Sequence, residues 1–464
     1  MGRRIDESPL GPIVEFSRRT NLGIAGRAFR PDGVPEATRV LLRGLGARLD
    51  GDLALGTRRE GDRLDWARRW MPASRAAADG LGDLVGGLRI GISMVLEPKT
   101  AVLALLLAEA GAEVSVFAFA AETDDDVARD LAARGIAVHA AASATPQEER
   151  AHALTLLDGA PQLLVDDGAH VIRLAHEVRP QVVAGLVGAT EETTSGVRPL
   201  RAMAADGALR IPVIAANDAV TKTWFDNRHG TGETCVLAIA RTIDDDLSDA
   251  RAAVVGFGPV GEGVAERLRV LGADVTVVDV DPRRALAARF AGHRTAPLLD
   301  AVRDADLVVS ATGAPGTIDG AVLAACRDDA VVAVAGGAPE EVLPPAGTAA
   351  TRIAPHVERL TLPDGGSVRL LAGGDCVNIV AAEGNPIGVM DLSFAVQLAA
   401  IRELLTVRLR PGVHPLPEAA DRAVSAVVVA AGRRGTGHGA VPCGVLDWRR
   451  TRFEARTPAT PPQP

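Results

Sequence analysis

The segment NDAVTKTWFDNRHGTGET, residues 217–234, concentrates groups that can move protons. Lys222 and Asp226 stand four residues apart, one turn of a helix, so their charged ends can meet. A lysine beside a carboxylate in a partly dry cleft has a shifted proton affinity and can serve as a base. The pattern alone fits both a catalytic cleft and a polar hinge between domains. Further polar residues are interleaved here with two aromatic ones: Asn217, Asp218, Asn227 and Glu233 with Trp224 and Phe225.

A glycine-rich loop, AAVVGFGPVGEG, follows this segment and carries GxGxxG spacing through Gly256, Gly258 and Gly261. It comes directly after an apolar strand and before a helical stretch, the context of a dinucleotide-binding turn whose helix N-terminus faces the pyrophosphate. Asp279 ends the next strand, eighteen residues after Gly261, where an acid accepts hydrogen bonds from ribose hydroxyls and would repel a 2′-phosphate. The sequence therefore predicts NAD rather than NADP. The alternative is that the glycines only make a tight turn.

The elements that must position these residues form two series of β-rich runs alternating with helical stretches. The first series occupies residues 87–96, 112–119, 137–141, 163–168, 182–189 and 212–218, and the second 251–258, 274–281, 306–313 and 330–337. The pattern predicts an α/β protein with two doubly wound, Rossmann-like domains of parallel strands. The helical segment DLSFAVQLAAIRELL (391–405) is expected to return to the first domain.

The predicted domain organisation follows from these runs. We expect an N-terminal extension of unassigned role (1–60), a substrate-binding domain (61–225, completed by about 385–430), an NAD-binding Rossmann domain (226–375), a C-terminal segment (376–455) and a disordered Pro-rich tail (456–464).

Composition excludes several other classes of protein. At 464 residues and 47% hydrophobic content the chain can bury a large core, and a net charge of -9 provides no basic surface for nucleic acid. Its four cysteines form no CxxC pair, so neither a metal site nor a disulfide framework is predicted. There is no signal-peptide pattern and no run of 18 apolar residues. We expect a cytoplasmic enzyme with a small-molecule substrate and no membrane partner.

Several motifs in order resemble the S-adenosyl-L-homocysteine hydrolase family. They include LDWARRWMP, EPKTAVL, LLVDDG, GATEETTSGV, the 217–234 segment, VVGFGPVGEG and CVNIVAAEGNPIGVMDLSFAVQLA, and the similarity spans roughly residues 64–430. The EPKT and GTGE variants are similar to the bacterial and archaeal thermophile branch. The resemblance implies a homotetramer with tightly held NAD. It also implies oxidation of a ribose 3′-hydroxyl, loss of the acidified 4′-proton, elimination of the 5′-substituent, addition of water and reduction of the ketone.

The resemblance assigns roles residue by residue. Lys222 with Asp226 matches the pair that takes the 3′-hydroxyl proton, Asp167 matches the carboxylate near the 4′-proton, and Glu192 matches the acid that holds the ribose hydroxyls. Taken alone, Asp166–Asp167 would be a strand-end turn and Glu191–Glu192 a helix N-terminal charge pair. The residues matching the NAD shell, Ser195 replacing the family's Thr and Arg284 its usual Asn, are Thr193, Thr194, Ser195, Asn227, Gly256, Gly258, Val260, Gly261, Asp279, Arg284, Thr312, Gly313, Gly336 and Asn378. The expected substrate contacts are Glu97, Lys99, Thr100, His170, His229 and Asn385.

The histidines that the family places around the 5′-carbon are replaced. Val95, Gly337 and Asn385 stand at the positions of the family's LH, GHF and GHP histidines. Valine and glycine cannot transfer protons or activate water as imidazoles do. His170 and His229 are candidates to replace them, although each also fits a packing or surface role.

Three functions remain open. The first is a dehydratase or lyase that expels the 5′-group, reduces the ketone without adding water, and releases a 4′,5′-unsaturated nucleoside, as in nucleoside antibiotics of the angustmycin type. The second is an S-adenosylhomocysteine hydrolase with different acids and bases. The third is an inactive NAD-binding regulator, against which the presence of Lys222, Asp226, Asp167 and Glu192 argues.

Overall fold

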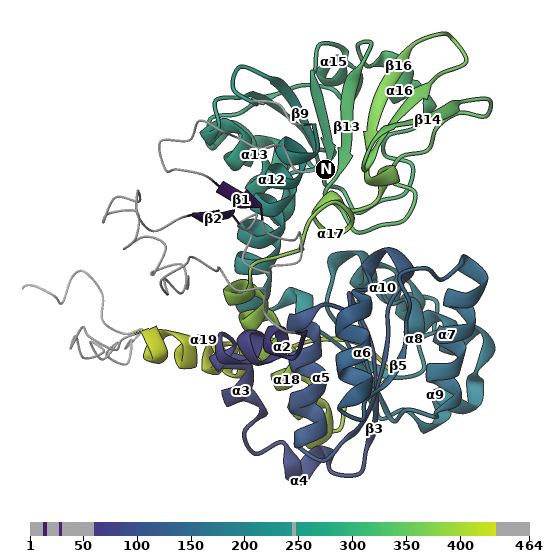
Figure 1. Ribbon diagram of the computed structural model, residues 1–464, viewed down its shortest axis with the longest axis vertical. Coiled ribbons are helices and arrows are strands. Elements are labelled where there is room, and N and C mark those ends of the chain that lie inside the picture. Colours follow the sequence, from purple (N-terminus) through teal and green to yellow (C-terminus); the bar gives the residue numbers. More distant parts are fainter. Residues whose placement is uncertain (1–12, 16–26, 30–59, 244–246, 433–464) are drawn as a thin grey trace, which may run out of the picture.

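Two β-sheets, one in each of two lobes, organise the chain in the computed structural model, which describes residues 13–15, 27–29, 60–243 and 247–432 (Figure 1). A short antiparallel pair, β1 (Ile13–Glu15) and β2 (Arg27–Phe29), is described near the N-terminus. The rest of the predicted N-terminal extension and the whole predicted tail (456–464) lie outside the described residues.

The first lobe contains a seven-stranded parallel sheet in the order β17-β8-β7-β6-β3-β4-β5. Its strands are short and rich in valine, isoleucine and alanine, as expected for a sheet covered on both faces. Their bounds are β3 (Arg89–Ser93), β4 (Glu113–Phe117), β5 (Ala137–His139), β6 (Leu163–Asp166), β7 (Gly188–Glu191), β8 (Pro212–Ala215) and β17 (Gly412–Pro415).

Helices cover both faces of this sheet and are separated by alternating strand residues. On β6, Leu163 and Val165 pack with one set of helices and Leu164 with the other. The first set is α2 (Glu60–Arg69), α3 (Pro72–Ala78), α4 (Gly82–Val85), α5 (Pro98–Glu109), α6 (Asp125–Ala133), α18 (Ile387–Thr406) and α19 (Glu418–Gly432). The second set is α7 (Pro146–Asp158), α8 (His170–Val178), α9 (Pro180–Gly185) and α10 (Thr194–Ala205).

The second lobe contains an eight-stranded sheet in the order β11-β10-β9-β12-β13-β16-β15-β14. It is parallel from β11 to β16 and antiparallel at β15 and β14. The strands are β9 (Arg251–Val255), β10 (Asp274–Val278), β11 (Arg294–Thr295), β12 (Leu307–Ser310), β13 (Ala330–Val334), β14 (Ala349–Ala354), β15 (Val357–Thr361) and β16 (Ser367–Leu371).

Two helical layers enclose this sheet as well. The layer against Ala252 and Val254 contains α12 (Gly232–Ile243), α13 (Pro259–Val270), α14 (Pro282–Phe290) and α17 (Val377–Val380). The layer against Ala253 and Val255 contains α15 (Leu298–Arg303) and α16 (Gly320–Ala325). Short segments η2 (Ala120–Glu122), η3 (Ala216–Asp218), α11 (Val220–Lys222), the π-helix η4 (Thr223–Thr231) and η5 (Ala372–Gly374) complete the chain.

The predicted fold class is confirmed: two doubly wound units follow one another, and the chain returns to the first. Helix α18 packs against α3, and β17 pairs with β8, so residues after 386 complete the first lobe. One expected strand is wrong in part. Residues 182–185 belong to α9, because Pro180 begins a helix there, and β7 starts only at Gly188.

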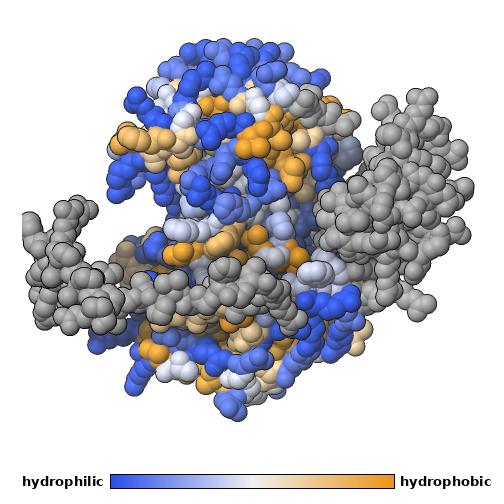
Figure 2. Space-filling view, turned by 90° about the vertical axis from the view of Figure 1, so that its left-hand side faces the viewer, coloured by the Kyte–Doolittle hydropathy of each residue, from blue (hydrophilic) through white to orange (hydrophobic). Residues whose placement is uncertain are grey.

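The surface narrows between the two lobes, where hydrophobic side chains are exposed among hydrophilic ones (Figure 2). Within the part of the chain that the structure describes, no helix is both long enough and apolar enough to cross a membrane.

Candidate active site

A cavity between the lobes lies where the strand order of each sheet reverses. In the first sheet the reversal falls between β3 and β6, and in the second between β9 and β12. Ligands of open α/β sheets bind at such points, beyond the carboxyl ends of the strands. Residues after all four strands line one common cavity: Val95 after β3, Asp167 after β6, Gly258 after β9 and Thr312 after β12. The topology therefore brings two binding crevices face to face.

Lys222 is the centre of a buried charged cluster on one wall of this cavity. Its Nζ lies 2.5 Å from Asp226 Oδ2, 3.6 Å from Glu192 Oε1 and 2.8 Å from Asn227 Oδ1, to which it donates a hydrogen bond. Burial would lower the pKa of Lys222, but Asp226 and Glu192 more than offset this and raise it. The predicted meeting of Lys222 and Asp226 is thus present in the structure, on a π-helical turn of the kind found at functional sites. The lysine is an ammonium here, so it can accept a proton only after it has given one of its own to a neighbouring carboxylate.

Glu192 enters the cluster from the end of β7 and is held by α18. Gln397 Nε2 donates to Glu192 Oε2 at 2.5 Å, and Ser393 Oγ donates to Oε1. Burial raises the pKa of Glu192 to about 7, with Lys222 opposing the shift. A carboxyl group near its midpoint can both accept and donate hydrogen bonds, which suits a pair of adjacent hydroxyl groups.

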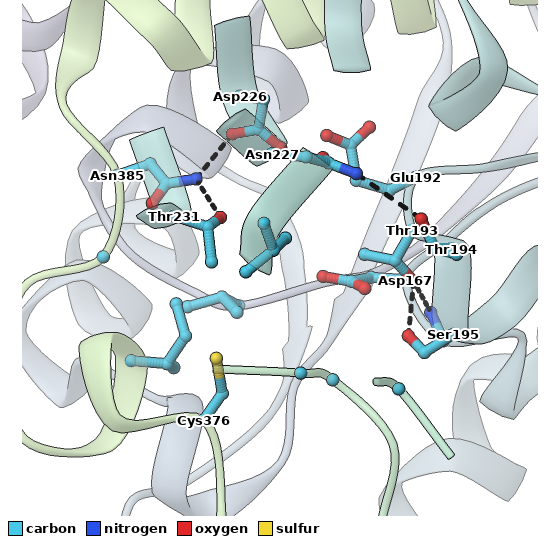
Figure 3. Close-up of a pocket in the computed structure, with 18 of the residues that line it drawn as sticks. Asp167, Glu192, Thr193, Thr194, Ser195, Asp226, Asn227, Thr231, Cys376 and Asn385 are labelled. Atoms are coloured by element: carbon cyan, nitrogen blue, oxygen red, sulfur yellow. Dashed lines mark hydrogen bonds between the residues drawn. The ribbon is translucent and has the colours of Figure 1, made fainter. Parts of the chain in front are cut away.

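Asp226 is fixed from its other side by Asn385. Asn385 Nδ2 donates to Asp226 Oδ1 at 2.5 Å and to Thr231 Oγ1 at 3.0 Å (Figure 3). The opposite end of the amide, Oδ1, accepts from Thr234 Oγ1 and Asn378 Nδ2, both at 3.0 Å. Both ends of the Asn385 amide are therefore engaged by protein. The structure places this residue, expected at the substrate, in the cavity wall as a support for the Lys222–Asp226 pair.

Asp167 directly follows β6 and lines the same cavity. Its pKa is raised by burial, while Lys222 acts in the opposite direction. The turn that carries Asp167 is held by Glu191, which accepts from the backbone N–H groups of Gly168 and Ala169 at 2.9 Å. Thr193 Oγ1 also donates to Glu191 and accepts from Ser195 Oγ at 3.0 Å, a bond drawn in Figure 3.

Three of the expected substrate contacts come from the start of α5. Glu97 caps that helix by accepting from Lys99 N, and its Oε2 lies 3.1 Å from Lys99 Nζ. Lys99 Nζ also donates to the carbonyl of Glu383 at 3.3 Å, which ties α5 to the segment before α18. Glu97, Lys99 and Thr100 all line the cavity.

The two candidate replacement histidines lie in different environments. His170 lines the cavity, with its ring 5.0 Å from that of Phe119 in an edge contact. Burial lowers the pKa of His170, so its imidazole is neutral near pH 7. His229 is exposed on η4 and does not line the cavity. The structure therefore does not bring His229 to the substrate.

The three substituted histidine positions all line the cavity. Val95 and Gly337 contribute no acid or base, and a Cβ built on Gly337 would lie 3.0 Å from Ser195 Oγ. The sequence reasoning missed Glu122, which also lines this cavity from η2. In the sequence, Glu122 precedes the acidic start of α6 (AETDDDV) and is indistinguishable from a solvated helix terminus.

The second lobe supplies a loop shaped for a dinucleotide. Gly256 has a φ of +96°, and a Cβ on Gly261 would lie 1.8 Å from the Gly256 carbonyl oxygen, so both must be glycine. Asp279 accepts from Phe257 N at 2.7 Å and Asp281 N at 2.8 Å, which places its carboxylate beside the loop. A Cβ on Gly258 would enter the cavity 3.6 Å from Arg284 Nη1. This bare backbone beside a guanidinium and a helix N-terminus fits a pyrophosphate.

The remaining predicted cofactor residues divide into two groups. Gly256 and Gly261, which shape the loop, and Asp279, which holds its backbone, are not in the cavity wall. Those in the cavity wall are Thr193, Thr194, Ser195, Asn227, Gly258, Val260, Arg284, Thr312, Gly313, Gly336 and Asn378. Both lobes contribute, so a bound dinucleotide would contact the charged cluster of the first lobe.

Comparisons with known proteins agree with this geometry. Residues 227–384 match the family description "S-adenosyl-L-homocysteine hydrolase, NAD binding domain". The chain is 36% identical over 383 residues to the S-inosyl-L-homocysteine hydrolase of Methanothermobacter thermautotrophicus, covering 81% of this chain and 92% of that protein. It is 37% identical over 372 residues to the adenosylhomocysteinase of Thermotoga maritima, covering 78% and 92%. The predicted cofactor, NAD, is confirmed by the NAD-binding domain.

Proposed function

The chain belongs to the S-adenosyl-L-homocysteine hydrolase family, and on that premise we propose that it eliminates the 5′-substituent of an adenosine-type nucleoside without adding water. In this proposal the substrate is oxidised at C3′, loses its C4′ proton and its 5′-group, and is reduced again at C3′. The leaving group is the 5′-hydroxyl, so the net reaction is a dehydration to a 4′,5′-unsaturated nucleoside.

One observation carries the proposal: the groups needed for oxidation are assembled, whereas the 5′ end has no imidazole from the family's three positions. Lys222, Asp226 and Glu192 form one buried cluster. Val95 and Gly337 have no titratable group, and the amide of Asn385 is bound to Asp226. Water addition at C5′ needs a base beside that carbon, and these positions provide none.

The oxidation step follows from the buried cluster. Glu192 would hold the adjacent ribose hydroxyls and orient C3′ toward the second lobe. Lys222 would pass one of its protons to Asp226 and take the 3′-hydroxyl proton in its place, while Asn227 holds the ammonium group. Bound NAD supplies the hydride acceptor and later returns the hydride. Since the cluster is buried, little water competes for these hydrogen bonds.

Asp167 would then remove the C4′ proton. A ketone at C3′ acidifies that position, and a carboxylate whose pKa is raised by burial is a better base than an ordinary aspartate. Lys222 opposes the upward shift and favours the ionised form that can accept the proton. The pair of electrons left at C4′ expels the 5′-group and forms the alkene.

The second candidate is an ordinary hydrolase, and the relatives favour it. Two of them are named for S-inosyl- and S-adenosyl-homocysteine, so the family splits thioethers of more than one nucleoside. For this chain, hydrolysis would need a water-activating group at C5′ other than the three replaced histidines. The neutral His170 is a candidate for that group, because its imidazole lines the cavity.

We also propose self-association, as the resemblance implies. Trp224 and Phe225 on η4 are 64% and 41% exposed, which is unusual for large hydrophobic side chains next to a catalytic cluster. A second copy of the chain would cover them. Sedimentation of the purified protein tests this directly: a monomer at micromolar concentration would contradict it.

The test of the proposed reaction is product mass. The purified protein is incubated separately with 5′-hydroxy adenosine-type nucleosides and with S-adenosylhomocysteine, and products are identified by mass spectrometry. We expect a product lighter than the nucleoside by one water and little adenosine from the thioether. Rapid formation of adenosine and homocysteine would instead support the hydrolase.

A further inference from the structure

We propose that Glu122 is the general acid that protonates the departing 5′-group, in place of the family's imidazoles. This inference rests on the proposed function, because it assigns the proton donor for the same elimination. It concerns a residue on an element, η2, that contributes nothing to the charged cluster around Lys222.

The backbone brings Glu122 beside one of the replaced histidine positions. Leu96 N donates to the Glu122 carbonyl at 2.9 Å, and Asp124 N donates back to Leu96 O at 2.9 Å. Leu96 directly follows Val95, so η2 and the loop after β3 are joined at the point where the family's first imidazole is missing. Val95 and Glu122 then line the same cavity. A carboxyl group therefore lies near the position at which the family has an imidazole.

The carboxyl group of Glu122 differs from the other acids in the cavity wall because, in the part of the chain that the structure describes, no side-chain hydrogen bond or ion pair engages it. Glu97 is paired with Lys99, Glu192 is bound by Ser393 and Gln397, and Asp226 contacts Lys222. No side-chain hydrogen bond or ion pair joins Glu122 to any residue in the described ranges 60–243 and 247–432. Glu122 is half-buried and lines the cavity, so its carboxyl group is open to a ligand bound there.

The environment keeps this group protonated at neutral pH. Burial, with a further contribution from the nearby Asp167, raises the pKa of Glu122 to about 8. The charges of Asp375 and Glu149 also raise the pKa of Glu122. The two carboxyl groups therefore have different roles in the elimination. Asp167, whose anionic form is favoured by Lys222, accepts the C4′ proton, and the protonated Glu122 donates a proton to the 5′-group.

Other donors in the cavity wall fit less well. The imidazole of His170 is neutral and lies edge-on to Phe119, and its lowered pKa makes it a poor acid. The hydrogen bond with Cys235, together with burial, raises the pKa of the Cys376 thiol well above its usual range. Lys222 is committed to the 3′ end by Asp226 and Asn227.

The proton and electron balance closes with these two carboxyls. Asp167 takes the C4′ proton, the C4′ electron pair becomes the C4′–C5′ π bond, and the C5′–O bond breaks toward oxygen. Glu122 gives its proton to that oxygen, and water departs. Asp167 then holds the extra proton and Glu122 is a carboxylate that could add the water back, so a transfer from Asp167 to Glu122 must follow at once; it restores both groups and removes that base. The nucleoside has lost one water, and no further oxidant or reductant is needed.

Glu122→Gln removes the acidic proton with little change in shape, and since the carboxyl has no partner among the described residues the fold should be kept. Four measurements are made on the NAD-loaded protein: reduction of the cofactor on adding nucleoside, exchange of the C4′ proton with deuterated water, release of unsaturated product, and turnover of a 5′-chloro-5′-deoxy analogue. Chloride needs no proton to depart. Glu113→Gln, on the exposed start of β4, is the matched control.

We expect Glu122→Gln to keep cofactor reduction and C4′ exchange, to lower dehydration about 10²–10⁴-fold, and to turn over the chloro analogue like the wild type. Asp167→Asn should show the opposite pattern, with cofactor reduction but no C4′ exchange. Near-normal dehydration by Glu122→Gln, or an equal loss on both substrates, would overturn the assignment. If the wild type instead released homocysteine from S-adenosylhomocysteine and no unsaturated product, the proposed function would fail. The same comparison on homocysteine release would then still decide the role of Glu122.

Discussion

Replacing Asn385 by alanine should impair oxidation at C3′ although Asn385 need not touch the reacting atoms. The change removes two hydrogen bonds from Nδ2, at 2.5 Å to Asp226 Oδ1 and 3.0 Å to Thr231 Oγ1. A hydrogen bond to a charged group contributes about 1.5–3 kcal/mol. If Asp226 loses that support in the transition state, oxidation slows by roughly 10–150-fold, at about 1.4 kcal/mol per factor of ten.

The assay is single-turnover reduction of bound NAD after mixing with nucleoside, with NAD content measured on the same samples. Two further variants order the effect. Thr234→Val removes one bond at the far end of the amide, 3.0 Å from Asn385 Oδ1, together with the bonds of Thr234 Oγ1 to Gly230 O and Asn378 Nδ2. It leaves both bonds of Asn385 Nδ2 in place and should cost less than Asn385→Ala. Asn385→Asp sets a second carboxylate against Asp226 and should cost more, because like charges repel at short range in a buried site. An Asn385→Asp variant with wild-type oxidation would refute the reasoning.

Three other outcomes follow from the same structure. Lys222→Ala should keep fold and NAD but slow oxidation about 10²–10⁴-fold, and near-normal cofactor reduction in that variant would show that the base lies elsewhere. Asp279→Ala should weaken NAD binding, measured by titration, by about 1–3 kcal/mol, because both the Phe257 N–H group and the ribose hydroxyls lose the carboxylate that accepts their hydrogen bonds. An unchanged affinity would contradict that role. The pKa of Glu122 is raised by burial to about 8, against 4.5 for an ordinary glutamate. The folded state therefore holds a proton that the unfolded chain has lost, so the contribution of Glu122 to stability falls as pH rises from about 4.5 to 8. Glu122→Gln should therefore be more stable than wild type near pH 9, by about 5 kcal/mol at the upper limit and by less where solvent in the cavity reaches the carboxylate. Equal free energies of unfolding for the two proteins in urea at pH 9 would be inconsistent with the raised pKa.

The sequence allowed the fold to be predicted because its apolar runs are short, β-rich and separated by amphipathic segments. The runs before Gly256 and Asp279 became β9 and β10, and DLSFAVQLAAIRELL became part of α18 in the first lobe. The run at 182–189 was ambiguous, since a short apolar stretch fits a helix as well as a strand. Pro180 decided the matter by starting α9.

The site was predictable where spacing along one element determines contact. Lys222 and Asp226 are one turn apart on the same helical stretch, so their pairing follows from the chain itself. The partners of Asp226 and Glu192 that come from residues 385–397 depend on the return of the chain to the first lobe, and no local pattern reveals them. Glu122 is visible only when η2 is seen beside the loop after β3. His229 lies outside the cavity because the π-helix turns it outward, which its position in the motif does not disclose.

The central claim is that the enzyme eliminates at C5′ and adds no water. The most direct measurement is product mass from a 5′-hydroxy adenosine-type nucleoside and from S-adenosylhomocysteine, each run in ordinary and in heavy-oxygen water. The account predicts a nucleoside lighter by one water that carries no oxygen from the solvent, and little adenosine from the thioether. Adenosine carrying solvent oxygen at C5′, formed rapidly with homocysteine, would contradict it.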